Sequence, residues 1–279
     1  MRVLIVLLLA LAVAGCSMRE YALSSLGDAL AAGGDTYSAD DDIELVGAAT
    51  PFGLKTIESL LAEVPDHKGL LLAAARGFTQ YAYVYVHTPA EQLEERDVAL
   101  AYAQQARARR LYLRARDYGL RGLEVDRDDV GLLYWTAVAW AAAISLSKDD
   151  PATLAGLPFV DALIERAAKL DIDYDRGTLR SFLIGYEMGR PNARPGAEQR
   201  ARAHFARAVE LSEGRHAGPY VSLAESVAVD KRNRAEFESL LRRAIQVDPG
   251  ARREWRLANL VMQRRARRLL ERADELFPE

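Results

Sequence analysis

Apolar residues recur at spacings of three and four along most of this chain, and this spacing constrains the fold more than any other feature. Four clear examples begin at Leu54, Val160, Ala201 and Phe237. Residues spaced in this way lie on one face of an α-helix. Half of the residues are hydrophobic and 28% are charged, which excludes wholesale disorder. We therefore expect an all-α protein.

Glycine, proline and acidic residues fall between the apolar stripes and set the expected helix boundaries. Gly33 can end a first helix, Gly189 can end a later one, and Pro51, Pro89 and Pro158 suit the first turns of helices. The expected helices span residues 18–32, 41–49, 52–64, 67–87, 90–124, 128–147, 158–170, 175–188, 197–212, 216–228, 233–247 and 252–276. A short helical turn is expected after Pro151.

One stretch has a conflicting pattern. Tyr81, Tyr83 and Tyr85 alternate with smaller residues, as in a strand. We still predict a helix there, because the helical pattern of residues 70–75 continues into this stretch with Gly77 as the only possible break.

The ends of several expected second helices share a pattern of arginine, a small residue, hydrophobic residues and then an aspartate or an equivalent. The four copies begin at Arg121, Arg166, Arg207 and Arg243. This pattern resembles the end of a tetratricopeptide (TPR) repeat, in which a small residue lets two helices approach closely. The best copy spans residues 217–250, with the small residue at Ala244. We expect a degenerate TPR-like α-solenoid or helical bundle of antiparallel helix pairs with a C-terminal capping helix.

The first sixteen residues have the features of an export signal. Arg2 precedes an unbroken apolar run of residues 3–13, which is too short to span a bilayer. Val13-Ala14-Gly15-Cys16 then resembles a bacterial lipobox. In signals of that family the signal peptidase cuts before the cysteine, which is diacylglycerylated and N-acylated. Cys16 is the only cysteine in the chain. An ordinary secretory signal and an uncleaved anchor are the alternatives.

These features suggest a simple organisation. Residues 1–15 form a lipoprotein signal peptide, 16–40 a lipidated N-terminus with a first helix and linker, and 41–279 the TPR-like domain. The residue after the cysteine is Ser17, which by the sorting rule of Gram-negative lipoproteins indicates the outer membrane. The longest apolar stretch of the mature chain is residues 132–146, a length typical of a buried helix. The protein is expected to face the periplasm and to touch the membrane only through its N-terminal lipid.

The sequence lacks the motifs of catalysis and of metal or cofactor binding. It has no nucleophile elbow, zinc-protease motif or phosphate-binding loop, and its four histidines are scattered. Asp40-Asp41-Asp42 fits a helix N-terminus better than a calcium site. The net charge of −3 argues against nucleic acid as a partner. We predict no enzyme activity, no cofactor and no metal.

Two clusters are candidates for recognition. Tyr134, Trp135 and Trp140 lie in the most apolar segment, followed by Lys148 and Asp149. Core packing is the default interpretation of these aromatic residues, and a groove or pore with Lys148 and Asp149 at its rim is the alternative.

The second cluster is basic. Eight arginines lie between Arg252 and Arg272. Nucleic acid is one candidate partner, although an exported protein rarely meets it. Anionic lipid headgroups or an acidic partner are a second candidate, and a solvated cap face balanced by nearby acids is the third interpretation.

Longer stretches resemble a known family, the TatT components associated with TRAP transporters. Members of this family are periplasm-facing TPR lipoproteins. Besides the lipobox, the resemblance rests on residues 40–46, 49–61, 134–135, 145–151, 218–225, 254–260 and 263–266. It implies a degenerate TPR bundle that forms a homotrimer, has a pore in each protomer and binds the extracytoplasmic TRAP solute-binding protein. The implied cargo is an organic acid or a hydrophobic ligand. A TPR lipoprotein scaffold for outer-membrane or cell-envelope assembly is the alternative function, and a peptidoglycan hydrolase is a weaker one.

Overall fold

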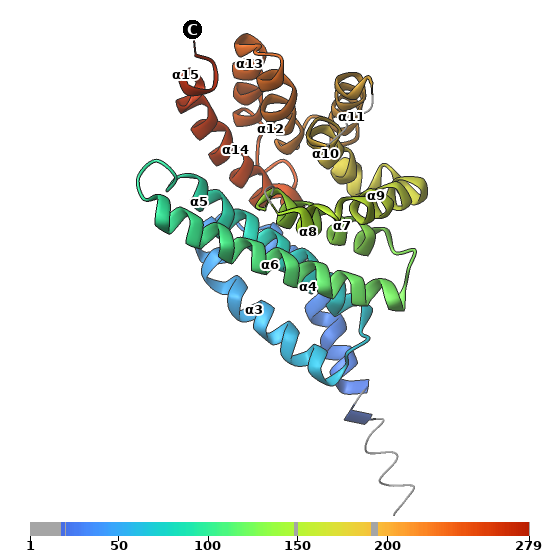
Figure 1. Cartoon of the computed structure of the whole chain (residues 1–279). Coiled ribbons are helices and arrows are strands. Elements are labelled where there is room, and N and C mark those ends of the chain that lie inside the picture. Colours follow the sequence, from blue (N-terminus) through green and yellow to red (C-terminus); the bar gives the residue numbers. More distant parts are fainter. Residues whose placement is uncertain (1–17, 20, 148–149, 191–194, 279) are drawn as a thin grey trace, which may run out of the picture. The chain divides into compact units, whose positions relative to one another are not determined.

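The computed structural model describes residues 18–19, 21–147, 150–190 and 195–278, and its regular elements are helical (Figure 1). No strand occurs in these ranges, so the all-α prediction is confirmed. The predicted signal peptide and Cys16 lie outside the described residues. Within the described part, no helix combines the length and apolarity needed to cross a membrane.

The chain forms two compact units. The first contains the described residues up to Gly34 together with Gly47–Asp161, and the second contains Asp35–Val46 together with Ala162–Glu279.

The first unit is built around three long helices. Residues 18–19 and 21–32, which we call the N-terminal helix, precede α3 (Ile43–Glu63). The helices α4 (Lys68–Ala82), α6 (Val98–Val125) and α7 (Val130–Ser145) pack on one another. Shorter elements connect or follow them: η1 (Tyr83–His87), α5 (Thr88–Glu91), α8 (Pro151–Leu154) and the start of α9 (Leu157–Asp171).

The second unit is a succession of helices in which chain neighbours pack together. It contains α2 (Gly34–Ser38) apart from Gly34, the start of α3 up to Val46 and α9 from Ala162 onward. The remaining elements are α10 (Tyr174–Gly189), α11 (Ala197–Leu211), α12 (Gly218–Leu223), η2 (Ala224–Ala228), α13 (Arg234–Ile245), η3 (Arg253–Trp255), α14 (Arg256–Glu271) and α15 (Ala273–Leu276). The pairs α10–α11, α12–α13 and α13–α14 are in contact, as stacked helix pairs require.

The best TPR-like copy has the expected core. Tyr220 of α12 and Phe237, Leu241 and Ala244 of α13 are buried in one hydrophobic cluster. Ala266 of α14 belongs to the same cluster, so α14 covers the apolar face of the last helix pair. This is the capping role predicted for the C-terminal helix.

The largest error in the predicted boundaries concerns Pro51. We expected separate helices at 41–49 and 52–64, but α3 runs through Pro51 without a break. A proline inside a helix costs about 3 kcal/mol. Here the helix is held on both sides of the proline, since Ile43 and Val46 are buried before it and Leu54 and Leu61 after it. This packing offsets the local cost.

The expected helix at 90–124 was also wrong at its start. Residues 92–96 form turns, and α6 begins after Asp97, whose side chain accepts a hydrogen bond from the Leu100 amide at 2.9 Å. An N-cap of this kind fixes where a helix begins.

The tyrosine-rich stretch is helical, as predicted, but part of it is a π-helix. The π-helical turn η1 spans Tyr83–His87, and η2 at Ala224–Ala228 is a second one. Sequence periodicity did not indicate either turn.

The C-terminal prediction of one helix at 252–276 was too long. The structure has η3, α14 and α15, with a break at Arg272.

In α10, predicted at 175–188, three residues have positive φ, ending at Gly177 with φ 95°. A Cβ on Gly177 would lie 3.2 Å from the Cα of Ala208, so this turn lets α10 approach α11 closely. The helix boundaries at 128–147, 158–170, 197–212, 216–228 and 233–247 agree within a few residues, and the helical turn after Pro151 is present as α8.

Candidate functional site

The predicted aromatic cluster divides into a buried part and a surface part. Tyr134 is 6% exposed, and its ring meets Trp135 edge to face with centroids 5.0 Å apart. Both residues lie on α7, which begins after Asp129, whose carboxylate accepts a hydrogen bond from the Leu132 amide at 2.9 Å. The burial of Tyr134 matches core packing.

Trp140 lies one to two turns further along α7 in a layered arrangement. The Phe159 ring stacks on it with centroids 5.5 Å apart and an interplanar angle of 8°. The Arg116 guanidinium lies 5.1 Å from the centroid of the Trp140 ring. Phe159 is 61% exposed, so an open aromatic surface adjoins Trp140. Arginine beside an indole contributes about 0.5–2 kcal/mol, depending on how far the pair is desolvated.

The polar rim predicted at Lys148 and Asp149 lies outside the described residues. The next residue, Asp150, is the N-cap of α8 and accepts hydrogen bonds from Thr153 Oγ1 at 2.5 Å and from the Ala152 amide at 3.0 Å. The hydrogen bond from Thr153 lowers the pKa of Asp150. Arg109 donates from Nη2 to Thr153 Oγ1 at 3.0 Å, whereas its buried Nε has no hydrogen-bond partner among the residues that the structure describes.

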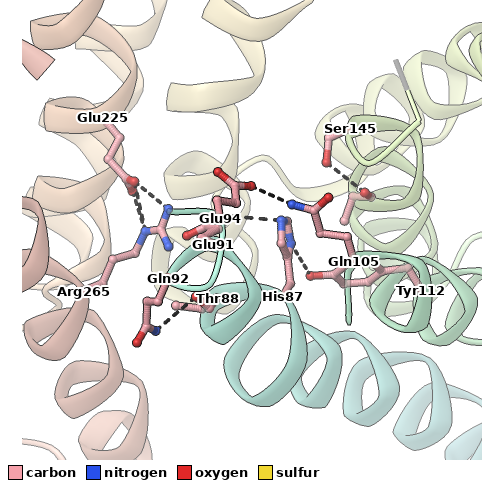
Figure 2. A network of polar contacts seen from close by, with 11 residues as sticks. His87, Thr88, Glu91, Gln92, Glu94, Gln105, Tyr112, Ser145, Glu225 and Arg265 are labelled. Carbon is pink, nitrogen blue, oxygen red and sulfur yellow. Dashed lines mark hydrogen bonds and ion pairs between the residues drawn. The ribbon is translucent and has the colours of Figure 1, made fainter. Parts of the chain in front are cut away.

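A second polar cluster of the first unit surrounds η1, and sequence reasoning missed it (Figure 2). His87 Nδ1 lies 3.1 Å from the Tyr112 hydroxyl, and His87 Nε2 lies 3.8 Å from a Glu91 oxygen. Gln105 Nε2 donates to Glu94 Oε1 at 2.6 Å and thereby holds the turn before α6 against that helix. No motif in the sequence brings these residues together, because they meet only through the π-helical turn and the turns at residues 92–96.

In the second unit, η2 carries an acidic residue held by α14. Arg265 donates from Nε and Nη2 to the Glu225 carboxylate, with the shortest distance 2.7 Å (Figure 2). A paired contact of this kind is among the stronger charge-assisted interactions. It fixes the orientation of α14 against η2.

The second unit also contains a cavity of about 430 Å³ between the start of α3 and α14. Its lining consists of Asp41, Ile43, Glu44, Leu260, Arg264, Arg267, Arg268 and Glu271. Within it, Arg264 forms an ion pair with Glu44 at 2.7 Å, and no ion pair of Arg267 occurs among the described residues. Three basic and three acidic residues give the lining little net charge.

The three aspartates lie just before α3, at a helix N-terminus as predicted. Asp42 accepts a hydrogen bond from the Leu45 amide, and Asp40 accepts one from the Asp42 amide, both at 2.8 Å. Asp41 forms an ion pair with Arg256 at 3.0 Å. Among the described residues, no group of three or more histidine, cysteine, aspartate or glutamate side chains is placed to hold a metal ion.

Charged residues also line the contact between α10 and α11. Asp173 accepts hydrogen bonds from Arg207 and Arg180, both at a shortest distance of 2.8 Å, and the bond from Arg207 lowers the pKa of Asp173 most. Burial lowers the pKa of His204, and the Arg180 guanidinium 3.3 Å from its Nδ1 lowers it further. This network is an arginine-rich clamp between two helices.

Comparison with known proteins identifies the family. The model of the TRAP transporter T-component family matches residues 39–128 and 123–277. A protein of Treponema pallidum (strain Nichols) described as uncharacterized is 28% identical over 302 aligned positions, which cover 95% of this chain and 94% of that protein. The matched segments cover most of both compact units. The chain therefore belongs to the TRAP transporter T-component family and is an accessory component of a TRAP-type transport system.

Proposed function

We propose that this protein is a lipid-anchored, periplasm-facing component that binds the extracytoplasmic solute-binding protein of a TRAP transporter. The observation that carries the proposal is the family match at residues 39–128 and 123–277. The stacked helix pairs of the second unit support it, because such stacks expose broad surfaces suited to a folded partner. The alternative role in envelope assembly gains no support from the comparisons.

Direct binding to the partner is the central test. The solubilised lipoprotein should retain the purified solute-binding protein of its own transport system in a pull-down. A solute-binding protein of an unrelated importer is the matched control. If the lipoprotein retains both solute-binding proteins equally, or retains neither, the proposed docking role is refuted.

Lipid attachment at Cys16 is the second part of the proposal. It rests on the small residues that precede Cys16 and on the apolar run at residues 3–13. The expected consequence of Cys16→Ser is loss of the acylated form and release from the membrane fraction, with an unchanged helical circular-dichroism spectrum. Membrane retention of the variant would contradict acylation. Fractionation of the unaltered protein tests the predicted outer-membrane location.

Ligand binding is the third part, and the geometry favours Trp140 over Tyr134 as a contact residue. Trp140 adjoins the exposed Phe159 ring, whereas Tyr134 is buried. A hydrophobic ligand should therefore change the emission of Trp140. When a fatty acid is titrated in, this emission change should be absent in the Trp140→Phe variant. It should persist in Trp255→Phe, which alters a buried core residue. The opposite pattern would exclude this surface.

The homotrimer is the last part of the proposal and follows from family membership alone. Light scattering on the detergent-solubilised lipoprotein, corrected for bound detergent, should give three times the mass of one mature chain. A single-chain mass would contradict it.

A further inference from the structure

The N-terminal helix has one face that is fixed by packing. Leu23 packs against the core of the first unit, and a Cβ on Gly27 would lie 3.0 Å from a methyl group of Leu70. Ala31 lies against Gly69 in the same way, at 3.1 Å. These three residues are spaced by four and therefore define the inner side of the helix.

Polar contacts hold this helix in place. His67 Nε2 lies 3.1 Å from the Ser24 carbonyl oxygen and 3.3 Å from an Asp28 oxygen. Arg19 forms an ion pair with Glu63 at 2.7 Å. The rotation of the helix about its axis is thus determined, and so is the side that it presents outward.

The opposite side, which we call the outer face, is uncharged and mostly apolar. It comprises Met18, Tyr21, Ala22, Ser25, Leu26, Ala29 and Ala32. All of them are exposed, with Met18 at 74%, Tyr21 at 76% and Leu26 at 50%. The charged residues Arg19 and Asp28 lie at its two edges. A second apolar face left open on a helix that is already packed on protein is typical of an interaction surface.

The position of the helix in the chain identifies that neighbour. Only Ser17 separates Met18 from Cys16, so their Cα atoms are at most about 7 Å apart. A lipid on Cys16 would hold the start of the helix at the membrane surface. Tyrosine beside aliphatic residues is typical of the interface between headgroups and acyl chains.

We propose that the outer face of the N-terminal helix lies in the headgroup and acyl-chain boundary of the bilayer that the Cys16 lipid enters. This inference rests on the proposed acylation. The lipid then acts together with a protein surface, since a helix inserted along its length fixes the orientation of the first unit at the membrane. A simple flexible tether would leave that orientation free.

The test uses the acylated full chain with one introduced cysteine. Acylation blocks the thiol of Cys16, so Leu26→Cys offers a single site for a thiol-reactive fluorophore. The labelled protein is reconstituted into phosphatidylcholine vesicles whose acyl chains carry bromine near the headgroups. The label at residue 26 should lose most of its emission relative to unbrominated vesicles.

Tyr102→Cys is the matched control. Tyr102 is 69% exposed on α6 and lies nineteen residues, or about 28 Å, from Arg121 along that helix. Arg121 donates to the Pro65 carbonyl oxygen beside the start of α4, near which the N-terminal helix packs. The label at residue 102 should keep its emission. Equal emission from both labels in brominated vesicles would overturn the inference.

The remaining outcomes separate the inference from the acylation on which it rests. Labelling of the unaltered chain would show a free thiol at Cys16, and the failure would then be that of acylation. If the fluorophore reacts with neither the unaltered chain nor the Leu26→Cys variant, Cys16 is acylated and a protein surface, such as a second copy, covers the outer face. The membrane assignment is then wrong. A Tyr21→Cys variant repeats the measurement on the same face.

Discussion

The close approach of α6 and α7 gives the most direct quantitative test of the packing. Gly119 lies in α6, where a Cβ would lie 2.9 Å from the Cβ of Thr136 and 3.3 Å from its Cα. Thr136 is fully buried, and its hydroxyl donates to the Leu132 carbonyl at 2.6 Å. Neither the backbone atom nor the hydrogen-bonded side chain can move aside at low cost.

Two opposed effects determine the result of Gly119→Ala. Replacing glycine by alanine inside a helix stabilises it by about 1 kcal/mol. Overpacking a closely packed contact costs about 1–3 kcal/mol. Because backbone atoms take part in this contact, we expect a cost near the upper end and a net loss of about 1–2 kcal/mol in the free energy of unfolding.

Gly185→Ala is the matched control, because a Cβ there would have no atom within 4 Å. Gly185 lies inside α10, so the same substitution should stabilise the protein by up to about 1 kcal/mol. Denaturant unfolding of the detergent-solubilised lipoprotein, followed by circular dichroism, measures both variants against the unaltered chain. A Gly119→Ala protein as stable as the unaltered chain would refute the close packing of α6 on α7.

Three further predictions concern the second unit. Burial lowers the pKa of His216 from 6.5 to about 4, so up to about 3 kcal/mol of stability present above pH 6.5 should be lost as the pH falls towards 4. His216→Gln should flatten that part of the stability curve, and an unchanged curve would contradict a neutral, desolvated imidazole at this partly buried position. Asn259 is fully buried, accepts a hydrogen bond from the Ala217 amide and donates one to the Arg215 carbonyl oxygen, both at 2.9 Å. Asn259→Ala should lower the free energy of unfolding by about 2–4 kcal/mol, because both backbone groups lose their partner. A decrease of less than about 1 kcal/mol in urea unfolding would contradict these hydrogen bonds. Phe237→Ala should cost about 3–5 kcal/mol in the same measurement, because the ring is fully buried and contacts the Phe277 ring with centroids 5.1 Å apart.

The sequence predicted the helices well where burial and periodicity agree. Phe237, Leu241 and Ala244 stand at regular spacings and are all buried in one cluster. Pro51 shows where this reasoning fails, since local propensity indicated a boundary and packing on both sides of the proline overrode it. The π-helical turns could not be predicted, because an inserted residue in a helix leaves no regular trace in an apolar stripe.

The candidate sites were less predictable than the fold. Trp140 was singled out for its residue type, but its neighbours Arg116 and Phe159 lie on two other helices and meet it only in the folded unit. The contact of His87 with Tyr112 could not be predicted, because the two residues lie 25 positions apart in the sequence. Side-chain chemistry can be recognised in a sequence, whereas the approach of such residues depends on helix packing.

The arginines near the C-terminus show how a basic sequence can form a nearly balanced surface. At least five of the eight form ion pairs within the described part of the second unit, namely Arg252, Arg256, Arg264, Arg265 and Arg272. Their acidic partners include Asp41, Glu44 and Glu225, which are remote in sequence and reach α14 only through the fold. An acidic partner would have to replace these pairs and would gain little net charge attraction. The structure therefore favours the interpretation of α14 as a capping helix over that of an anion-binding surface.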